Sequence, residues 1–576
     1  MAQAEQPGSV VPAPVAPGRL PLLGHAVQLW RRPIAFLESL REHGEVVRLD
    51  IGTWPVHVLT SPEHVHDVLV QQAQRFGRGR VFERLRPMFG NGIVTTDGDF
   101  HRKQRRMMQP AFHRGHITEY AEVMGRQATA MSSSWTSGRE VSMVTETRRY
   151  ALSSVAEMIF SGDLSRPAVE EVHRSLPIVL EGMLIRAVMP KSLDRLPIPL
   201  NRRFDAAATR LRAIIDQVIA TYGSDGEERH DLLSLLLSSV DAETGAGMPP
   251  EQVRDEVIAI MFAGTETSAT TLAWTFHELG RHPEVQERLQ AEVDEVVGEG
   301  PVRAEDLARL TYAHDVFQEA LRLHSPLLFT RRALAPLTLG GFAIPAGAEL
   351  AYSPYALHRD PELFPDPTVF DPDRWRRGAG ERSRDHRYVP FGAGQHKCIG
   401  DTFAVAEILT ALATVSSRWH LTPAPGVTVR EVPAGIPQPS ELPMIPIARP
   451  SSGRHWRNPV PRRSSARRSP TGSPRPSATP GSWRRPPNSS PRRPATRRTP
   501  APGCACRPNS SSGTPSASTR RTPRPGPGCS PSSRSGSSAG AWPSGTSWAC
   551  APGTPPCAAN RWAPPWSTRS RRSTEA

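Results

Sequence analysis

The stretch FGAGQHKCIG, residues 391–400, places one cysteine among three glycines and two basic side chains. Cys398 is the only cysteine before Cys504 in a chain of 576 residues. A lone cysteine is most often a small buried apolar residue. Here, however, a glycine-rich loop meets the start of an expected helix, where free backbone N–H groups and the helix dipole would stabilise a thiolate. The sequence therefore predicts a functional thiolate.

Three kinds of chemistry could use this cysteine. Zinc is a poor match, because Cys398 and the nearby His396 leave at least two ligands missing. A catalytic thiol would need a histidine partner held by a third group, which one sequence does not exclude. A thiolate ligand to haem iron needs only one cysteine. Haem also needs cations for its two propionates, and His396 is placed to be one.

Four motifs in chain order resemble those of the cytochrome P-450 family. FGAGQHKCIG resembles the family's haem-binding signature, and AGTETS, residues 263–268, resembles its oxygen-activating segment. EALR, residues 319–322, matches Glu-x-x-Arg, and FDPDRW, residues 370–375, resembles the segment that supplies a second arginine. Each motif alone is weak, but four in order are specific. The resemblance covers about residues 17–449.

The resemblance implies a mainly α fold with small β-sheets and a haem between the long central helix and the cysteine loop. It makes Cys398 the proximal iron ligand, whose thiolate pushes electron density to the iron and favours O–O cleavage. It places Phe391 against the haem near the sulfur. The glycines Gly392 and Gly394 permit tight turns, and Gly400 is expected to allow close packing of the following helix.

Further haem contacts follow from the same resemblance. The stretch DGDFHRKQRRMMQPAFH resembles the family's Trp-x-x-x-Arg element, with His101 in place of tryptophan and Arg105 in register. Together with His396 they would bind the propionates. Arg331 is the expected third contact on this side, and Arg332 replaces it if the register slips by one.

The AGTETS segment is expected to form the oxygen-facing side of the site. Ala263 and Gly264 would lie beside the porphyrin, where Gly264 leaves room for dioxygen. The Thr267 hydroxyl can bond the carbonyl of Ala263 and bend the helix locally. The resemblance implies that Thr267 hydrogen-bonds the oxygen and helps deliver protons, with Glu266 as relay. In most helices such residues are plain surface side chains, but this pair directly follows an apolar run.

Glu319 and Arg322 are three residues apart and share a helix face. As an isolated surface pair they would contribute little. With the other motifs, we expect a buried structural triad completed by Arg374, which maintains the fold and retains the haem.

The elements that must position these residues are mostly helices. Start and stop signals predict one long helix over 249–280, with an apolar middle from Val257 to Ala263 that runs through the core. A second helix is predicted near 304–324, and a third after Cys398. Short alternating runs in 331–360 predict hairpins.

Composition divides the chain near residue 450. Residues 1–450 hold 48 Lys+Arg against 55 Asp+Glu, whereas residues 451–576 hold 22 Arg and one acid. We therefore expect a disordered N-terminus at 1–16, a haem-thiolate monooxygenase domain at 17–450, and a disordered Arg/Pro/Ser-rich tail. A nucleic-acid-binding protein is the competing reading, and it rests on this tail alone.

The tail has a second explanation in the genetic code. Only seven of its 126 residues require A or T at the second codon position. This bias is expected when a GC-rich gene is translated out of frame, so we hypothesise a frameshift near residue 450; a true basic tail is the alternative. The nucleotide sequence decides, because a shift by one base should give a prompt stop or protein-like sequence.

The expected activity is that of a monooxygenase that uses O2 as co-substrate. No Gly-x-Gly-x-x-Gly unit for flavin or NAD is found, so electrons are expected from a ferredoxin and its reductase. The basic side chains of Arg376, Arg377 and Arg382 could dock an acidic ferredoxin. With no anchor or signal segment apparent and five of six cysteines in the tail, we expect a monomeric, cytoplasmic protein.

The substrate is expected to be an apolar small molecule, because Ile260, Met261 and Ala263 of the central helix are apolar. The chain resembles actinobacterial members of the family that oxidise sesquiterpenes, which implies terpenoid hydroxylation. Fatty acids, steroids and macrolides remain open. A non-catalytic haem-binding protein would keep Cys398 but would need neither Glu266 nor Thr267.

Overall fold

The computed structural model describes residues 11–160, 165–188, 196–222, 231–298, 300–377 and 386–450. The chain divides into two units, residues 1–465 and 466–576, and every described residue belongs to the first. The tail 451–576 lies outside the described residues. Within the N-terminus expected to be disordered, residues 11–16 are ordered instead. Ala13 and Ala16 are buried, and the Ala16 N–H donates to the carbonyl of Arg48 at 3.0 Å.

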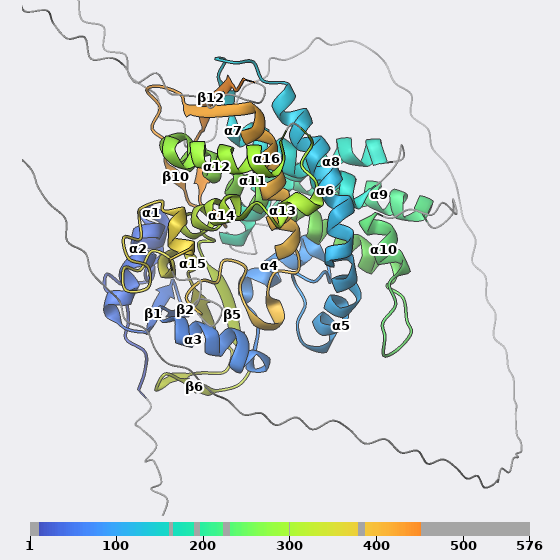
Figure 1. Ribbon diagram of the computed structural model, residues 1–576. Helices are drawn as coiled ribbons and strands as arrows, with labels where there is room; N and C mark the ends of the chain where they lie inside the picture. The colour runs from blue at the N-terminus through green and yellow to red at the C-terminus, as the bar shows by residue number, and fades with distance from the viewer. Residues whose placement is uncertain are drawn as a thin grey trace, which may run out of the picture. The chain divides into compact units, whose positions relative to one another are not determined.

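Helices dominate the described part of the chain, as the sequence predicted; α1, α2, α3 and α15 lie beside the strands β1, β2 and β5, while α6 to α10 lie away from them (Figure 1). The α-helices are α1 (Ala26–Arg31), α2 (Pro33–Ser39), α3 (Pro62–His66), α4 (Arg80–Phe89), α5 (Gly98–Met108), α6 (Arg114–Ser133), α7 (Met143–Ile159), α8 (Ser165–Val188), α9 (Pro199–Tyr222), α10 (Leu232–Ser238), α11 (Pro250–Arg281), α12 (Pro283–Val296), α13 (Ala304–Leu307), α14 (Thr311–Leu323), α15 (Pro354–Leu357) and α16 (Asp401–Arg418). Short helical turns used below are η6 (Pro372–Trp375) and η8 (Gly394–His396).

The strands form small sheets. They are β1 (Val46–Ile51), β2 (Trp54–Leu59), β3 (Phe76–Arg78), β4 (Val141–Ser142), β5 (Phe329–Ala333), β6 (Leu337–Leu339), β7 (Phe342–Ile344), β8 (Glu349–Tyr352), β9 (Trp419–Pro423), β10 (Glu431–Val432), β11 (Gln438–Pro439) and β12 (Pro443–Ala448). The largest sheet has the order β1-β2-β8-β5-β3, and β2 pairs with β8 in parallel. The hairpins expected in 331–360 are confirmed by β6 with β7 and by the antiparallel pair β5 and β8.

The long helix predicted over 249–280 is confirmed as α11, residues 250–281. A helix of this length rises about 48 Å at 1.5 Å per residue. Residues 257–262 are buried on every side, so α11 passes through the core between α7 and α16. Ala263, expected to be buried with them, is exposed instead. The helix therefore borders an open space at this position.

The prediction of a single helix near 304–324 is wrong in one respect, because the chain forms two helices there, α13 and α14. The Asp306 carboxylate accepts the Arg303 N–H at 2.9 Å and closes the first turn of α13. Glu292 of α12 accepts the N–H groups of Tyr312 and Ala313 at 2.7 and 2.8 Å, which starts α14 anew. Sequence periodicity does not reveal such a cap from a distant helix.

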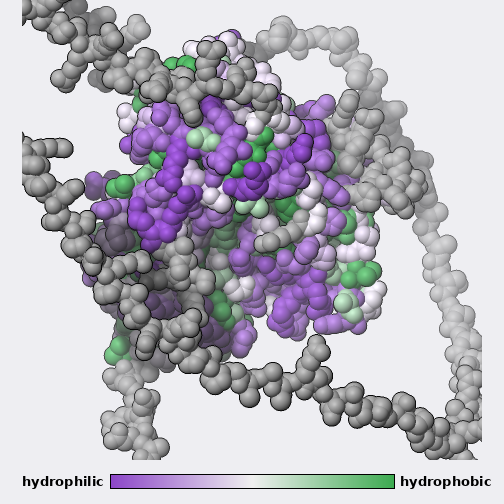
Figure 2. Space-filling view, viewed as in Figure 1, coloured by the Kyte–Doolittle hydropathy of each residue, from purple (hydrophilic) through white to green (hydrophobic). Residues whose placement is uncertain are grey.

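The described surface is mainly hydrophilic on the face shown, with apolar residues in separate patches (Figure 2). Among the helices of the described residues, none combines the length and the apolar character needed to span a bilayer.

Candidate functional site

The cysteine loop is built by glycines in conformations that other residues rarely adopt. Gly392 and Gly394 have φ of +67° and +65°. A Cβ at Gly394 would lie 1.8 Å from the carbonyl oxygen of Leu69, so only glycine fits this close approach. The Cys398 N–H donates to the carbonyl of Phe391 at 2.9 Å and closes the loop. A Cβ at Gly400 would meet only the Phe112 ring, at 3.9 Å, so the expected packing requirement at Gly400 is not found.

The thiol of Cys398 is exposed and lies three residues before the start of α16. Although the side chain is exposed, the protein atoms around the sulfur partly desolvate it and raise its pKa, and the Gly400 N–H lowers the pKa without offsetting the rise. The thiolate at Cys398 stays a prediction, and the N–H groups before α16 do not by themselves account for it. A cation bound at the sulfur would supply the missing stabilisation, because a metal ion deprotonates a coordinating thiol.

The middle of α11 presents two exposed residues one turn apart, Ala263 and Thr267, although their neighbours in the helix are mostly buried. The Thr267 hydroxyl donates to the Ala263 carbonyl at 2.5 Å, as the sequence predicted. Such a bond widens the helix locally and keeps the hydroxyl at the edge of the open space. The pair therefore offers a small side chain and a hydroxyl to any group that occupies this space.

Gly264 does not have the role that the sequence predicted, which was to leave room for dioxygen. A Cβ at Gly264 would lie 3.1 Å from Cγ2 of Val155 in α7, a tight contact. The glycine therefore serves the packing of α11 against α7, and the free space beside α11 is provided by Ala263.

Glu266 is half-buried and held by two side chains. Its Oε1 lies 3.2 Å from Nη2 of Arg148 and accepts a hydrogen bond from Gln438. The carboxylate is thus fixed next to Thr267 in the chain, and Arg148 is a partner that the sequence did not indicate.

Cations gather on the other side of the cysteine loop. The rings of His101 and His396 lie 4.5 Å apart between centroids, and Nε2 of His396 lies 3.1 Å from Oδ1 of Asp97. Burial, followed by the charges of His396, Arg78 and Arg105, lowers the pKa of His101 to about 3. Burial likewise lowers the pKa of His396 to about 4, although the Asp97 side chain opposes this shift.

Two arginines complete this cation cluster from neighbouring strands. Arg78 of β3 and Arg331 of β5 are directly opposite each other in an antiparallel pair. Like charges at such positions are destabilising. Burial, and then the charge of Arg331, lowers the pKa of Arg78 to about 9, and burial also lowers the pKa of Arg331. With pKa values of about 3 and 4, His101 and His396 are neutral at pH 7, so the positive charge of the cluster comes from Arg78 and Arg331, and an anion would relieve their repulsion.

Sequence reasoning missed Arg78. The signal available was the run RFGRGR, in which three arginines alternate with apolar residues and glycines. Only the pairing of β3 with β5 selects Arg78 as the residue opposite Arg331. Arg332, the alternative to Arg331, pairs with Glu83 and Glu349 and so is not part of the cluster.

Arg105 lies between the cation cluster and the cysteine. Its Nη1 donates to the carbonyl of Lys397 at 2.5 Å, next to Cys398 in the chain. Burial lowers the pKa of Arg105, whereas the sulfur of Cys398 raises it. The guanidinium is therefore the cation that ties α5 to the cysteine loop.

These features fit a flat group that carries two carboxylates and a metal with one open position for a thiolate. Cys398 and Ala263 are exposed, Nδ1 of His101 and Nε of Arg78 are buried without a hydrogen-bond partner, and the single negative charge of Asp97 faces the two arginines. Haem has this composition. Among the described residues, no group of three or more His, Cys, Asp or Glu side chains could hold a metal by itself.

Glu319, Arg322 and Arg374 are brought together by the fold. Glu319 and Arg322 are fully buried, and Oε1 of Glu319 lies 2.8 Å from Nη2 of Arg322 and 3.2 Å from Nε of Arg374. Trp375 of η6 also donates to Glu319, at 3.0 Å. Arg322 in turn donates to the carbonyls of His358 and Pro367 at 2.8 and 2.7 Å. Removing one partner of such a pair costs about 3–5 kcal/mol.

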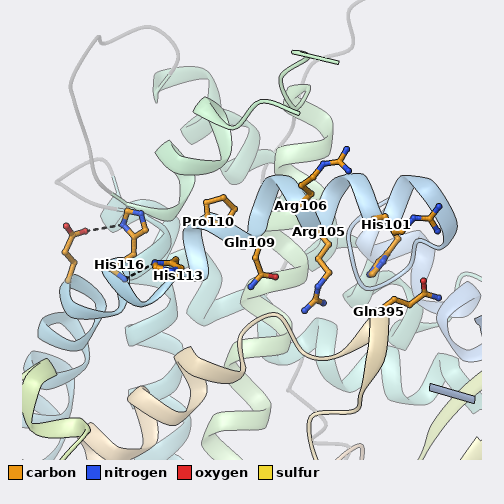
Figure 3. Close-up of a pocket in the computed structure, with 11 residues that line it drawn as sticks. His101, Arg105, Arg106, Gln109, Pro110, His113, His116 and Gln395 are labelled. Atoms are coloured by element: carbon orange, nitrogen blue, oxygen red, sulfur yellow. Dashed lines mark hydrogen bonds and ion pairs between the residues drawn. The ribbon is translucent and has the colours of Figure 1, made fainter. Parts of the chain in front are cut away.

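A groove of about 920 Å³ lies beside the cysteine loop, between α5, the start of α6 and Gln395 (Figure 3). In the view, His101 and Arg105 of α5 and Gln109, the residue after its end, point toward the loop that carries Gln395. The groove has one acidic lining residue and is otherwise basic or neutral; its lining is His101, Arg102, Arg105, Arg106, Gln109, Pro110, His113, Gly115, His116, Glu119 and Gln395. Positive side chains therefore outnumber the single acidic side chain in this groove.

The basic segment expected to dock a ferredoxin differs from this groove. Arg376 forms an ion pair with Asp315 at 2.6 Å, and Arg377 pairs with Asp371. Arg382 lies outside the described residues. The positive charge of Arg376 and Arg377 is thus partly compensated.

Comparison with known proteins gives a family model and relatives that agree with the motifs described above. The family model described as Cytochrome P450 matches residues 14–446. Cyclooctatin synthase of Streptomyces melanosporofaciens is 43% identical over 76% of this chain and 95% of the relative. Cyclooctat-9-en-7-ol 5-monooxygenase of the same organism is 41% identical over 75% of this chain and 94% of the relative. Pentalenene oxygenase of Streptomyces avermitilis is 38% identical over 73% and 94%.

Solved structures agree with this assignment. The crystal structure of the cytochrome P450DA heme domain matches with a TM-score of 0.69 and 25% identity, over 77% of this chain and 99% of that chain. The motifs around Cys398, the mainly helical fold and these relatives together establish the family: the chain belongs to the cytochrome P450 family.

Proposed function

We propose that this cytochrome P450 hydroxylates a terpenoid, with Cys398 as the thiolate ligand of haem b and Thr267 and Glu266 as the proton-delivery pair. The observation that carries the proposal is that one chain combines an exposed Cys398 in its glycine loop, exposed Ala263 and Thr267 in the otherwise buried middle of α11, and two arginines, Arg78 and Arg331, that face each other. The similarity to cyclooctatin synthase and pentalenene oxygenase supports the substrate class.

The residues that would hold the haem come from four parts of the chain. Cys398 would bind the iron, while Phe391, Gly392, Gly394 and Gly400 shape the loop around the sulfur. The propionates would be bound by His101, Arg105, Arg331 and His396, with Arg78 as an additional cation. When bound, haem supplies the redox chemistry by which one atom of O2 enters the substrate and the other leaves as water.

Proton supply falls to residues of α11. The Thr267 hydroxyl is on an exposed residue and donates to the Ala263 carbonyl, so its lone pairs are available to accept a hydrogen bond. Glu266 is the nearest acid in the chain and is held by Arg148 and Gln438, so its carboxylate is oriented before substrate binds. We assign Glu266 the role of passing protons from the surface side toward Thr267.

The substrate class has a direct test. Pentalenene and cyclooctat-9-en-7-ol should each displace the water ligand of the ferric haem in the full-length holoenzyme, which shifts the Soret band to shorter wavelength. We expect dissociation constants in the micromolar range, about −8 kcal/mol. Lauric acid, testosterone and a macrolide serve as comparisons for the other substrate classes. Binding of one of these with no response to either terpenoid would contradict the terpenoid assignment.

Bacterial cytochromes P450 generally use redox partners, and we propose a ferredoxin and its reductase for this chain. The basic groove beside the cysteine loop is the surface that suits an acidic ferredoxin, because it reaches the loop one residue from Cys398 through Arg105 and Lys397. Charge complementarity there would steer the encounter.

Variants that introduce a negative charge distinguish the two candidate docking surfaces. Gln109→Glu adds a negative charge at the groove, and Arg376→Glu reverses one at the segment around η6. At low ionic strength, Gln109→Glu should slow reduction by ferredoxin about tenfold. The loss should shrink at high salt because exposed charges are screened. Slower reduction only in Arg376→Glu would place docking at η6 instead.

A further inference from the structure

The segment between α4 and α5, residues 90–96, lies against the first half of α11. It has the sequence GNGIVTT. Two adjacent carboxylates of α11, Asp255 and Glu256, bind its backbone. Both are buried, with 8% and 0% of their surface exposed. The segment is therefore fixed to the central helix by acids, although it has no regular secondary structure of its own beyond turns.

Glu256 is the centre of these contacts. Its Oε2 accepts the Ile93 N–H at 2.8 Å. Its Oε1 accepts from Nε2 of Gln104 at 2.7 Å and from Nε2 of Gln252 at 2.8 Å. Both glutamine amides also donate to the Asn91 carbonyl, at 2.6 and 2.9 Å. The Glu256 carboxylate thus binds the Ile93 N–H directly, and it holds the two glutamine amides that donate to the Asn91 carbonyl.

Asp255 binds the preceding residues. Its Oδ2 accepts the Asn91 N–H at 2.9 Å. Gly90 has a φ of +52°, and a Cβ there would lie 1.9 Å from Oδ2 of Asp255. Only glycine allows the carboxylate to approach the backbone so closely. Within the segment, the hydroxyls of Thr95 and Thr96 donate to the Gly92 carbonyl at 3.1 and 3.2 Å and tighten the turn.

Ile93 is held from its other side by the cation cluster. Its carbonyl accepts a hydrogen bond from Nη2 of Arg78 at 3.0 Å. The backbone of Ile93 therefore bridges Glu256 on α11 and Arg78 beside the haem-facing cations. A change at Glu256 would shift a residue that contacts both the helix and the cluster.

The same segment contributes to the apolar wall near the middle of α11. Ile93 and Val94 belong to the hydrophobic cluster that contains Ile260 and Met261. Glu256 precedes Ala263 by seven residues, two helical turns, or about 10 Å along the axis. The contacts of Glu256 and Asp255 with residues 90–96, called the clamp below, therefore lie two turns from the exposed Ala263, and Glu256 is on the same side of α11.

We propose that Glu256 is a positioning residue that sets the substrate wall by fixing residues 90–96 against α11. This inference rests on the proposed function, because it assigns the wall to a substrate cavity over haem. Glu256 does not touch substrate; it acts through Ile93 and Val94, whose side chains would restrict the size and orientation of large apolar substrates.

The clamp is retained at a cost to stability. Burial raises the pKa of Glu256 to about 8, although the Ile93 N–H and Gln252 oppose the shift. Among the described residues, no ion pair with Glu256 is found. A carboxyl with this pKa is mostly uncharged at pH 7, so Glu256→Gln removes little buried charge. Glu256→Gln should therefore separate a loss of binding from a loss of stability.

The test uses the full-length holoenzyme and two iron-binding probes, imidazole and 1-dodecylimidazole, titrated by absorbance. The two oxygens of Glu256 together accept three N–H groups, and Glu256→Gln replaces one of these oxygens by an NH2 donor. We expect the dissociation constant of 1-dodecylimidazole to rise about tenfold, while that of imidazole changes less than about twofold. Imidazole is too small to contact the wall, so it reports on the haem alone.

Glu278→Gln is the matched control. Glu278 lies on the same helix, is 5% exposed and binds His324 at 3.0 Å, far from residues 90–96 in the chain. The Glu278→Gln variant should leave the dissociation constants of imidazole and 1-dodecylimidazole unchanged. Equal weakening of 1-dodecylimidazole in both variants would indicate general loosening of α11 and overturn the proposal.

Hydrogen–deuterium exchange gives a readout that is independent of ligand binding. In Glu256→Gln the amides of Asn91 and Ile93 should lose protection, while amides of α14 keep theirs. Unchanged protection and unchanged affinity would together refute the clamp. Should Glu256→Gln fail to fold, Gln104→Met removes one partner of the carboxylate and carries the same expectation. If neither probe perturbs the spectrum of the wild-type protein, haem binding fails instead, and exchange still tests the clamp.

Discussion

Replacing Cys398 by serine should lower turnover about a thousandfold, equivalent to about 4 kcal/mol in the barrier. Cys398 is the only cysteine of the described residues, and its exposed sulfur borders the space in which the haem would lie. A serine hydroxyl is a weaker donor than a thiolate and does not push electron density to the iron in the same way. Product formation by the variant with ferredoxin and reductase measures the effect.

Lys397→Ala is the control for this substitution, because Lys397 is the exposed neighbour of Cys398 and its side chain forms an ion pair with Asp401 at 2.6 Å. Its backbone carbonyl, which binds Arg105, is unaffected by the change. The control should retain most of the turnover. Full activity in Cys398→Ser would remove the thiolate from the proposed mechanism.

Thr267→Ala should uncouple electron use from product formation. The hydroxyl that stands at the open space would be lost, and general acid–base contributions of this kind amount to about 100-fold or more. Consumption of reducing equivalents should continue while they appear as hydrogen peroxide. The ratio of product to NADH oxidised therefore falls, and this ratio, together with peroxide, is the quantity to measure.

Thr265→Ala provides a matched comparison two residues away. The Thr265 hydroxyl donates to the Met261 carbonyl at 2.7 Å, as Thr267 does to Ala263, but Thr265 is buried, with 1% of its surface exposed. Loss of the same kind of backbone hydrogen bond should leave coupling intact there. Normal coupling in Thr267→Ala, or equal uncoupling in both variants, would contradict the role given to Thr267.

Local signals in the sequence predicted much of the fold. The long helix was predicted within one residue at each end because prolines, an acid in the first turn and a terminal glycine mark its limits. The cysteine motif predicted the loop because its glycines adopt conformations that the chain cannot reach otherwise. Such features depend on neighbours in sequence, so one chain reveals them.

Features that depend on distant partners were not predictable. Arg78 joins the cation cluster only because β3 pairs with β5, and α14 begins at Thr311 only because Glu292 caps it from α12. Gly264 was expected to make room for oxygen, but its partner is Val155 of α7. In each case the deciding contact comes from an element whose position follows from the fold as a whole.

The absorption spectrum of the dithionite-reduced protein under carbon monoxide tests the central claim most directly. With Cys398 as a thiolate ligand, the full-length protein reconstituted with haem should give the strongly red-shifted Soret band that a thiolate ligand of the iron produces. A band at the shorter wavelength typical of a histidine or neutral thiol ligand, or no haem binding at all, would contradict the account.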